Sequence, residues 1–337
     1  MRAFRVLVPV ASPSPQLEGR YAHEMEALAD LDVEIVECEL SEKAFVSAAK
    51  GANAVYVKGV SISRQMIETL DRCLIIALGS VGVDYVDIEA ATDKGIPVTN
   101  CPDTFVEEVA DHTMMLLLAA HRRALEQDRI VREGRWDDGR AQLLEVPRLM
   151  GQTLGLVGFG HVGSAVALRA RPFGLRIVAY DPFVDETIVT GAGVQPMHIA
   201  ELLRASDFVS LHLPATDQTV GMFDEEHFRM MKSGAVFINT GRGSTVVEDA
   251  LLEALTKGWI AGAGLDVFAT EPVDVRNPLL NLPNVILSPH NASASARFNP
   301  ARKRRVGIEM ALVFNGKWPM SCANPEVLPA SGLRRWR

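Results

Sequence analysis

The sequence predicts an α/β fold with two domains, each built on a parallel β-sheet. Two observations carry this prediction. Short apolar runs alternate with helical stretches along most of the chain, and near its middle a glycine-rich turn joins one apolar run to a helix. Such alternation is typical of βα units in a parallel sheet. At 337 residues and 48% hydrophobic content, the chain is long enough for two cores of ordinary size.

The first hundred residues predict five strands and four helices that alternate. Each strand is a short apolar run, and each helix shows the apolar spacing of about 3.6 residues. The expected strands are residues 4–10, 33–38, 53–58, 74–78 and 97–100, and the expected helices are residues 18–29, 41–49, 63–69 and 86–93.

Residues 104–132 contain neither Gly nor Pro and carry apolar residues at helical spacing, which predicts one long helix. A second alternating series follows and predicts a six-stranded doubly wound sheet. Its strands are expected at 153–157, 176–180, 208–211, 235–239, 262–266 and 285–288, and its helices at 161–173, 198–205, 224–231 and 247–257.

A last helix, expected near residues 301–314, is too short to form a domain alone. We therefore expect it to fold back on the first series. This predicts a discontinuous domain of residues 1–100 plus 293–337, with residues 101–292 forming the other domain.

A dinucleotide-binding motif opens the second series. Gly158 allows a tight turn after the strand, Gly160 lets the main chain approach a pyrophosphate, and Gly163 lets the helix pack close to the sheet. Asp181 ends the next strand, where its carboxylate can accept both ribose hydroxyls of NAD but repels a 2′-phosphate. The following Pro182-Phe183-Val184 supplies no cation for NADP. The predicted cofactor is NAD.

Charge and cysteine content restrict the other function classes. The net charge of −8 predicts no basic surface for nucleic acid, and the longest basic runs are the short segments 302–305 and 334–337. The longest apolar stretch has seven residues, against the roughly 20 that cross a bilayer, so we expect no membrane span. The four cysteines lack metal-ligand spacing, which favours reduced thiols in a cytoplasmic protein without a metal site.

Three residues that follow predicted strands suggest hydride transfer to a 2-oxo acid. The Arg242 guanidinium can grip a carboxylate through a planar fork. His290 can deliver the proton that a developing alkoxide needs, and Glu271 beside it would favour the protonated imidazole. Parallel strands bind ligands at their carboxyl ends, so these side chains are expected to converge.

The chain resembles the D-isomer-specific 2-hydroxyacid dehydrogenases over nearly its whole length. The matching segments are Val81-Gly82-Val83-Asp84-Tyr85-Val86-Asp87, Gly95-Ile96-Pro97-Val98-Thr99-Asn100, Val109-Ala110-Asp111-His112-Thr113, Gly158-Phe159-Gly160-His161-Val162-Gly163, His212-Leu213-Pro214, Gly241-Arg242-Gly243, Gly264-Leu265-Asp266-Val267-Phe268 with Glu271-Pro272, and Pro289-His290.

The resemblance implies a Rossmann NAD-binding domain, a flavodoxin-like substrate domain that acts as a lid, and a homodimer built largely on the nucleotide domain. It gives Arg242, Glu271 and His290 the family's substrate-binding, acidic and acid/base positions. It places the substrate carboxylate on main-chain N–H groups near Ser80, Val81 and Gly82. The remaining NAD contacts that it implies, together with the glycine loop, are Thr113, His161, Val162, Leu213, Pro214, Thr219, Thr240, Gly241, Arg242, Asp266 and His290.

Within the family, the segments around Val106–Asp111 and Val166–Ala170 are most similar to the branch that contains the C-terminal-binding-protein corepressors. An NADH-sensing binding protein with little turnover is therefore the alternative to an enzyme. Ser293 and Leu78 depart from that branch, which carries a tryptophan and an arginine there. Retention of Glu271 and His290 favours catalysis.

The substrate identity stays open within the enzymes. Ser80, Ser293 and Ser295 suggest a polar cleft and a hydroxylated substrate such as hydroxypyruvate or a sugar-derived 2-oxo acid. Formate dehydrogenases carry glutamine where Glu271 stands and are disfavoured, whereas phosphite oxidation keeps all three residues and is a remote option.

Overall fold

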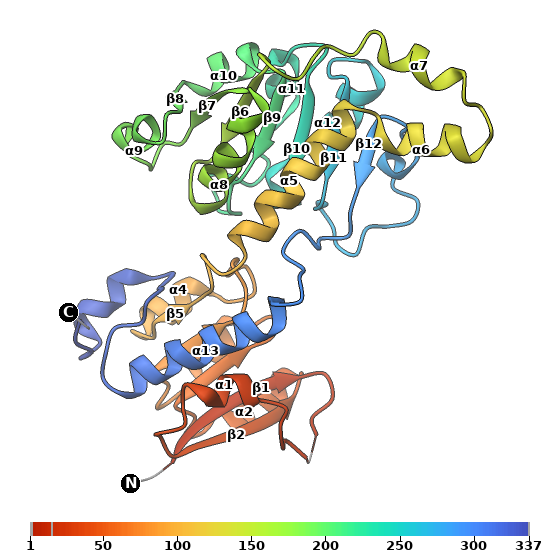
Figure 1. Ribbon diagram of the computed structural model, residues 1–337. Coiled ribbons are helices and arrows are strands. Elements are labelled where there is room, and N and C mark those ends of the chain that lie inside the picture. The colour runs from red at the N-terminus through yellow and green to blue at the C-terminus, as the bar shows by residue number, and fades with distance from the viewer. Residues whose placement is uncertain (1–2, 15, 336–337) are drawn as a thin grey trace. The chain divides into compact units, whose positions relative to one another are not determined.

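The computed structural model describes residues 3–14 and 16–335, and the chain divides into two compact units (Figure 1). Unit 1 consists of residues 1–105 and 295–337, and unit 2 of residues 106–294. The α/β class with two parallel sheets is thus confirmed.

Unit 1 contains a five-stranded parallel sheet of order β2-β1-β3-β4-β5, the order of flavodoxin-like sheets. The strands are β1 (Phe4–Val10), β2 (Val33–Glu39), β3 (Ala54–Val57), β4 (Ile75–Leu78) and β5 (Val98–Thr99); the helices are α1 (Ala22–Glu26), α2 (Glu42–Ala49), α3 (Arg64–Glu68), α4 (Ile88–Asp93) and α13 (Phe298–Phe314), followed by a 3-10 helix (Pro325–Ala330).

Side-chain alternation along these strands builds two hydrophobic cores in unit 1. On one face Leu7, Val55 and Ile76 pack with α2, α3 and α4. On the other face Val6, Val8 and Tyr56 pack with α1 and α13. The helix near the C-terminus therefore completes a unit whose strands all come from the first hundred residues.

Unit 2 contains a seven-stranded parallel sheet of order β12-β11-β10-β9-β6-β7-β8, a doubly wound arrangement. Its strands are β6 (Thr153–Val157), β7 (Arg176–Tyr180), β8 (Gln195–Pro196), β9 (Phe208–Leu211), β10 (Val236–Asn239), β11 (Gly262–Leu265) and β12 (Val285–Leu287); its helices are α5 (Val106–His121), α6 (Ala124–Arg132), α7 (Asp138–Leu143), α8 (His161–Ala170), α9 (Glu186–Gly191), α10 (Ile199–Ala205), α11 (Glu225–Met230) and α12 (Glu248–Thr256).

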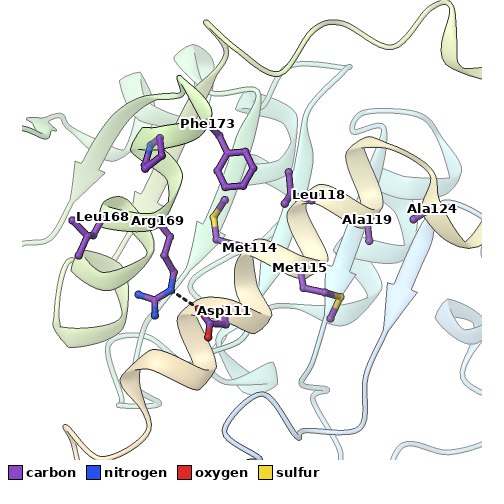
Figure 2. A pocket seen from close by; sticks show the side chains of 10 residues that line it. Asp111, Met114, Met115, Leu118, Ala119, Ala124, Leu168, Arg169 and Phe173 are labelled. Carbon is purple, nitrogen blue, oxygen red and sulfur yellow. Dashed lines mark hydrogen bonds and ion pairs between the residues drawn. The ribbon is translucent and has the colours of Figure 1, made fainter.

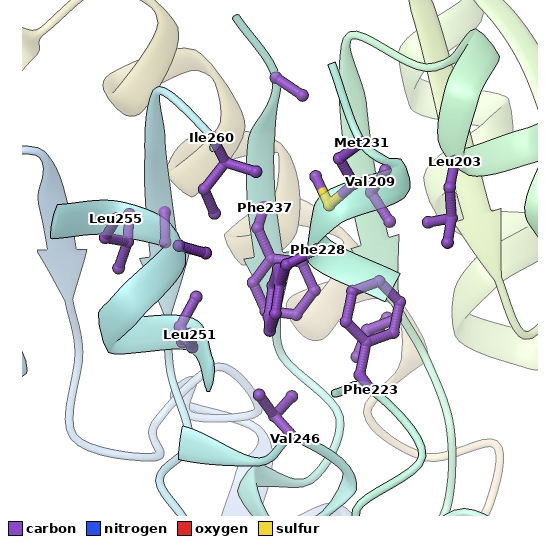
Figure 3. Close-up of a cluster of buried hydrophobic side chains, with 14 of the residues drawn as sticks. Leu203, Val209, Phe223, Phe228, Met231, Phe237, Val246, Leu251, Leu255 and Ile260 are labelled. Carbon is purple, nitrogen blue, oxygen red and sulfur yellow. The ribbon is translucent and has the colours of Figure 1, made fainter. Parts of the chain in front are cut away.

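Helices cover both faces of this sheet (Figure 1). On one face α5 and α8 pack against Leu154, Leu156 and Ile238. On the other, Phe223, Phe228 and Phe237 pack together and α10, α11 and α12 complete the core (Figure 3). The sheet is buried on both faces, so the carboxyl ends of its strands carry the polar residues considered below.

The prediction of one helix over residues 104–132 is wrong. Helix α5 ends at His121 and α6 begins at Ala124, because Arg123 adopts the left-handed conformation with φ of 49°. No Gly or Pro marks this break, so the apolar spacing alone could not reveal it. The helix expected over 18–29 is also shorter, and only residues 22–26 are helical.

Three elements of unit 2 were not predicted. Strand β8 has only two residues, so the sheet has seven strands rather than six. Helices α7 and α9 have six residues each and are too short for a clear periodic signal. Asp185 caps α9 by accepting a hydrogen bond from the Thr187 N–H at 2.8 Å. Over the described residues, no helix is both long enough and apolar enough to cross a membrane.

Candidate active site

The glycine-rich loop links β6 to α8, and each of its glycines meets a different steric demand. Gly158 has φ of +95°, and a Cβ there would lie 2.7 Å from the His212 carbonyl oxygen. A Cβ on Gly163 would lie 2.2 Å from the Gly158 carbonyl oxygen. A Cβ on Gly160 would meet nothing within 4 Å. Gly158 and Gly163 are therefore needed for packing, whereas Gly160 faces open space that a bound group can approach.

Asp181 follows β7 and is held by three main-chain N–H groups. One carboxylate oxygen accepts from Phe159 at 2.8 Å, and the other accepts from Phe183 at 2.9 Å and Val184 at 3.2 Å. A carboxylate has about four acceptor positions, so one remains after these bonds. These bonds tie the carboxylate to the glycine loop. The one remaining acceptor position can take a single ribose hydroxyl, rather than both hydroxyls as the sequence predicted.

The other residues predicted to contact the cofactor lie around the carboxyl ends of β9 and β10. Leu213 and Pro214 follow β9, and the Thr219 hydroxyl donates to the Pro214 carbonyl at 2.6 Å. The Thr113 hydroxyl on α5 lies 2.8 Å from the Thr240 hydroxyl after β10. His161 and Val162 form the first turn of α8.

His212, directly after β9, is a buried imidazole beneath the glycine loop. Its burial lowers its pKa to about 4, because removal from water disfavours the charged form. His212 is therefore neutral near pH 7.

Arg242 lies in a tight turn after β10 that its neighbours hold in shape. The Asn239 side-chain amide donates to the Arg242 carbonyl at 3.0 Å, and the Thr245 hydroxyl donates to the same oxygen at 2.6 Å. The Arg242 guanidinium donates to the Gly241 carbonyl at 2.8 Å. A Cβ on Gly243 would lie 2.0 Å from the Phe268 main chain. The sequence alone assigns no role to Asn239, whose bond to the Arg242 carbonyl becomes visible only in the folded turn.

Glu271 and His290 come from the loops after β11 and β12 and form a close pair. His290 Nδ1 lies 2.6 Å from Glu271 Oε2, and the other carboxylate oxygen accepts from the Phe268 N–H at 3.0 Å. The two side chains are 45% and 33% exposed. The pair is therefore both oriented and accessible, as an acid/base group must be.

Asp266 is fully buried and organises the loop that carries His290. Its carboxylate accepts from the Ser288 hydroxyl at 2.6 Å and from the N–H groups of Asn291 and Ala292 at 3.0 and 2.9 Å. His112 Nε2 lies 2.8 Å from the same hydroxyl. No role was predicted for His112 from the sequence, and only the contact across the fold reveals this bond.

The turn after β4 in unit 1 contains Ser80, Val81 and Gly82. All three of its carbonyl oxygens accept hydrogen bonds, from the Cys101 N–H, the Asn100 amide and the Ser80 hydroxyl respectively. Within residues 3–14 and 16–335, none of the three N–H groups has an acceptor. A turn with satisfied carbonyls and unused N–H groups suits an anion.

A hollow of about 870 Å³ in unit 2 contains none of the predicted site residues (Figure 2). Helices α5 and α8 supply most of its mainly apolar lining, and Arg169 forms an ion pair with Asp111 at 2.6 Å beside it. The described part of the chain contains no cluster of His, Cys, Asp or Glu able to hold a metal ion. All four cysteines are free; the cytoplasmic location inferred from them stays a prediction.

Comparisons with known proteins agree with this geometry. Residues 114–292 match the model of the D-isomer specific 2-hydroxyacid dehydrogenase NAD binding domain. A glyoxylate reductase of Korarchaeum cryptofilum is 40% identical over 315 residues, which are 93% of this chain and 95% of that protein.

Two solved structures are similar over almost the whole chain. An NADPH-dependent glyoxylate/hydroxypyruvate reductase of Sinorhizobium meliloti, in complex with NADP and malonate, has a TM-score of 0.82 and 31% identity, covering 100% of this chain and 99% of that chain. A D-lactate dehydrogenase of Aquifex aeolicus, complexed with NAD and lactic acid, has a TM-score of 0.76 and 30% identity, covering 96% and 98%. The comparisons do not single out the corepressor branch. The chain is a dehydrogenase with a domain for a nicotinamide dinucleotide, and it belongs to the D-isomer specific 2-hydroxyacid dehydrogenase family.

Proposed function

We propose that the protein interconverts a 2-oxo acid and a D-2-hydroxy acid with NAD, using Arg242 to bind substrate, His290 as acid/base and Glu271 to hold His290. The observation that carries the proposal is the 2.6 Å contact between His290 Nδ1 and Glu271 Oε2. Both loops follow strands that neighbour one another in the sheet, and the Arg242 turn follows the next strand, β10.

The two nitrogens of His290 have different tasks in this proposal. Because Nδ1 is held by Glu271, Nε2 is the nitrogen left to meet the substrate oxygen. The bound nicotinamide supplies the hydride that reaches the carbonyl carbon. His290 Nε2 then gives its proton to the oxygen of that carbonyl, and in the oxidation direction it takes the proton back.

Arg242 serves as the group that aligns the substrate. A guanidinium can hold a carboxylate by two parallel N–H bonds and keep the adjacent carbonyl in one orientation. The turn that carries Arg242 is fixed by Asn239, Thr245 and the close approach of Gly243 to Phe268. The arginine therefore starts from a rigid base.

The cofactor assignment rests on Asp181 and the open space beside Gly160. We assign NAD rather than NADP because a 2′-phosphate would meet the Asp181 carboxylate without a neighbouring cation from residues 182–184. The further contacts are proposed at Thr113, Gly158, His161, Val162, Gly163, Leu213, Pro214, Thr219, Thr240, Gly241, Arg242, Asp266 and His290.

The N–H groups of Ser80, Val81 and Gly82 are proposed to bind the substrate carboxylate. Their carbonyls are already hydrogen-bonded within unit 1, so the turn presents donors. A carboxylate is an acceptor-only group at neutral pH and matches such a turn.

We further propose a homodimer formed through unit 2. The hollow between α5 and α8 has an apolar lining in which Leu168 is 68% exposed. The segment of α6 and α7 in the same unit presents Leu125, Trp136 and Leu144, which are 62%, 76% and 77% exposed. In a two-fold dimer, the hollow of one subunit can bind the exposed apolar side chains of α6 and α7 from the second subunit, and the reverse contact forms at the same time.

A screen of 2-oxo acids with NADH, followed by loss of the reduced cofactor's absorbance, tests the proposed reaction. We expect turnover by the natural protein and a severe loss in Arg242→Lys, because lysine keeps the charge but not the planar fork. NADH binding without oxidation by any 2-oxo acid would overturn the proposal and favour the NADH-sensing alternative.

A further inference from the structure

Unit 1 contains a polar cluster that the proposed reaction does not use. It consists of Lys58 after β3, Arg302 on α13, Tyr56 on β3 and Glu24 on α1. These elements pack on one face of the sheet. Lys58 lies at the carboxyl edge beside the boundary between β1 and β3, where the strand order reverses. Open α/β sheets bind their ligands at such a reversal.

The cluster adjoins the turn assigned to the substrate carboxylate. A Cβ built on Gly79, the residue before Ser80, would lie 3.6 Å from Arg302 Cδ and 3.7 Å from the Tyr56 hydroxyl. Arg302 and Tyr56 therefore border the start of the turn.

Both cations are held in place but lack an anionic partner. Lys58 Nζ lies 5.0 and 5.7 Å from the ring centres of Tyr21 and Tyr56, and the Arg302 guanidinium lies 4.9 Å from the Phe298 ring. Among the residues that the structure describes, neither the Lys58 ammonium nor the Arg302 guanidinium makes a hydrogen bond or an ion pair to a protein group. Arg302 Nε is buried without a partner. Buried donors are normally satisfied, so the Arg302 side chain points to a missing acceptor, and Lys58 adds a second positive charge that has no acidic partner of the described chain within hydrogen-bond distance.

One acid lies nearby and does not satisfy them. Glu24 is 0% exposed, and neither of its carboxylate oxygens has a hydrogen-bond partner. Burial lowers the pKa of Lys58, as do the charges of Lys303, Arg20 and Arg302, while Glu24 raises it. Arg20 is engaged with Glu37 at 3.1 Å. Two positive charges against one carboxylate leave this cluster with a surplus that favours an anion.

We infer that Lys58 and Arg302 form a subsite for a second anionic group at the distal end of the substrate. This inference rests on the proposed function and names the substrate class: 2-oxo acids that carry a carboxylate or phosphate besides the C1 carboxylate. The C1 carboxylate binds the turn of residues 80–82, and the distal anion pairs with Lys58 and Arg302. The two cations then determine specificity and take no part in hydride or proton transfer.

Matched pairs of 2-oxo acids test the subsite. 2-Oxoglutarate and 2-oxopentanoate share a five-carbon chain and differ by the distal carboxylate. Oxaloacetate and 2-oxobutyrate share a four-carbon chain and differ in the same way. We expect the natural protein to favour the charged member of at least one pair by about tenfold or more in kcat/KM. Lys58→Met and Arg302→Met should each remove about tenfold of that preference by raising KM for the charged member only.

Two further variants distinguish an effect of the charge in the subsite from an effect of a disturbed fold. Glu24→Gln removes the opposing carboxylate and should lower KM for the charged member severalfold, whereas a merely disturbed fold would raise it. Arg304→Met, on the same helix but paired with Glu26 at 2.5 Å, should leave the preference unchanged. An equal effect of Lys58→Met and Arg302→Met on both members of each pair would overturn the subsite, as would a preference of the natural protein for the neutral members.

A binding measurement distinguishes this inference from the proposed function. Glutarate cannot be reduced, and calorimetric titration into the protein with NADH should show binding that weakens about tenfold in Arg302→Met, with no comparable effect for pentanoate. Glutarate binding of this kind without turnover of any 2-oxo acid would support the subsite and overturn the proposed reaction. Turnover of neutral 2-oxo acids without glutarate binding would overturn the subsite and leave the reaction intact.

Discussion

His290 is oriented by its backbone as well as by its side chain. It has φ of 47°, a conformation that non-glycine residues seldom adopt. Its N–H donates to the Asp266 carbonyl at 2.7 Å, while the Asp266 carboxylate binds the next two N–H groups. The buried Asp266 thus fixes the turn, and Glu271 fixes the ring at 2.6 Å. The protein surrounds one imidazole with hydrogen bonds that set its direction.

Replacing His290 by alanine tests its proposed role. We expect His290→Ala to lower kcat for 2-oxo acid reduction by about 10²- to 10⁴-fold, because the proton donor is lost. NADH binding, measured by fluorescence titration, should stay close to that of the natural protein. His23→Ala, at a histidine of unit 1 that pairs with Glu26, is the control. Turnover at the natural rate would remove His290 from the mechanism.

The choice of cofactor depends on Asp181. Asp181→Ala should lower the ratio of kcat/KM for NADH to that for NADPH by about ten- to a hundredfold, since the hydrogen bond to the ribose is lost and the repulsion of a 2′-phosphate disappears. Asp185→Ala, a carboxylate that caps α9, should weaken the fold slightly but keep the ratio. An unchanged ratio in Asp181→Ala would contradict the assignment of NAD.

At the scale of elements, most of the proposed site residues lie at the junctions that follow the strands. At the β6–α8 junction, Gly158 and Gly163 are needed because a Cβ would collide with the main chain, and Gly160 leaves open space that a bound cofactor can approach. The α5–α6 junction instead uses a left-handed arginine. At the β6–α8 junction glycine is required because other groups come close, whereas the α5–α6 junction accepts a positive φ at an arginine.

Two substitutions in the glycine loop should have opposite effects. Gly160→Ala adds a Cβ in open space, so the free energy of unfolding should change by less than about 1 kcal/mol while NADH binding weakens about tenfold or more. Gly163→Ala places a Cβ 2.2 Å from the Gly158 carbonyl oxygen and should cost about 1–3 kcal/mol of stability. Urea unfolding and NADH titration measure the two quantities. Loss of stability in Gly160→Ala with normal NADH binding would reverse this assignment.

The break between α5 and α6 predicts a stabilising substitution. Arg123→Gly should raise the free energy of unfolding by up to about 1 kcal/mol, because glycine adopts positive φ without strain. Arg122→Gly, one residue earlier and without positive φ, should lower it by about 1 kcal/mol instead. Thermal unfolding followed by circular dichroism compares the pair, and destabilisation by Arg123→Gly would show that the arginine side chain contributes more than the strain costs.

At the scale of the molecule, each sheet is completed by helices on both faces. The last helix, α13, belongs to unit 1 although more than 190 residues separate it from the strands it covers. Unit 2 has complete cores on both faces and still exposes apolar side chains around the hollow of α5 and α8. These exposed apolar side chains are the basis of the proposed dimer.

A charge in the hollow tests the proposed dimer. Leu168→Glu should shift the molar mass in solution from dimer to monomer, because an uncompensated carboxylate in an apolar interface is costly. Val275→Glu, at an apolar residue that is 86% exposed and does not line the hollow, should leave the mass unchanged. Light scattering during size-exclusion chromatography reports both, and a natural protein that elutes as a monomer would contradict the proposal.

The sequence by itself determined the α/β class, the position of nearly every long strand, the glycine loop and the family. These features are written in local patterns: apolar runs, helical spacing, and glycines where no Cβ fits. The left-handed Arg123, the short elements β8, α7 and α9, and the bond between His112 and Ser288 were decided only by tertiary structure. So was the placement of Lys58 over the Tyr21 ring and of Arg302 beside Gly79. Each depends on residues far apart in the chain or on a backbone conformation that the surrounding fold imposes, and local propensity carries neither signal.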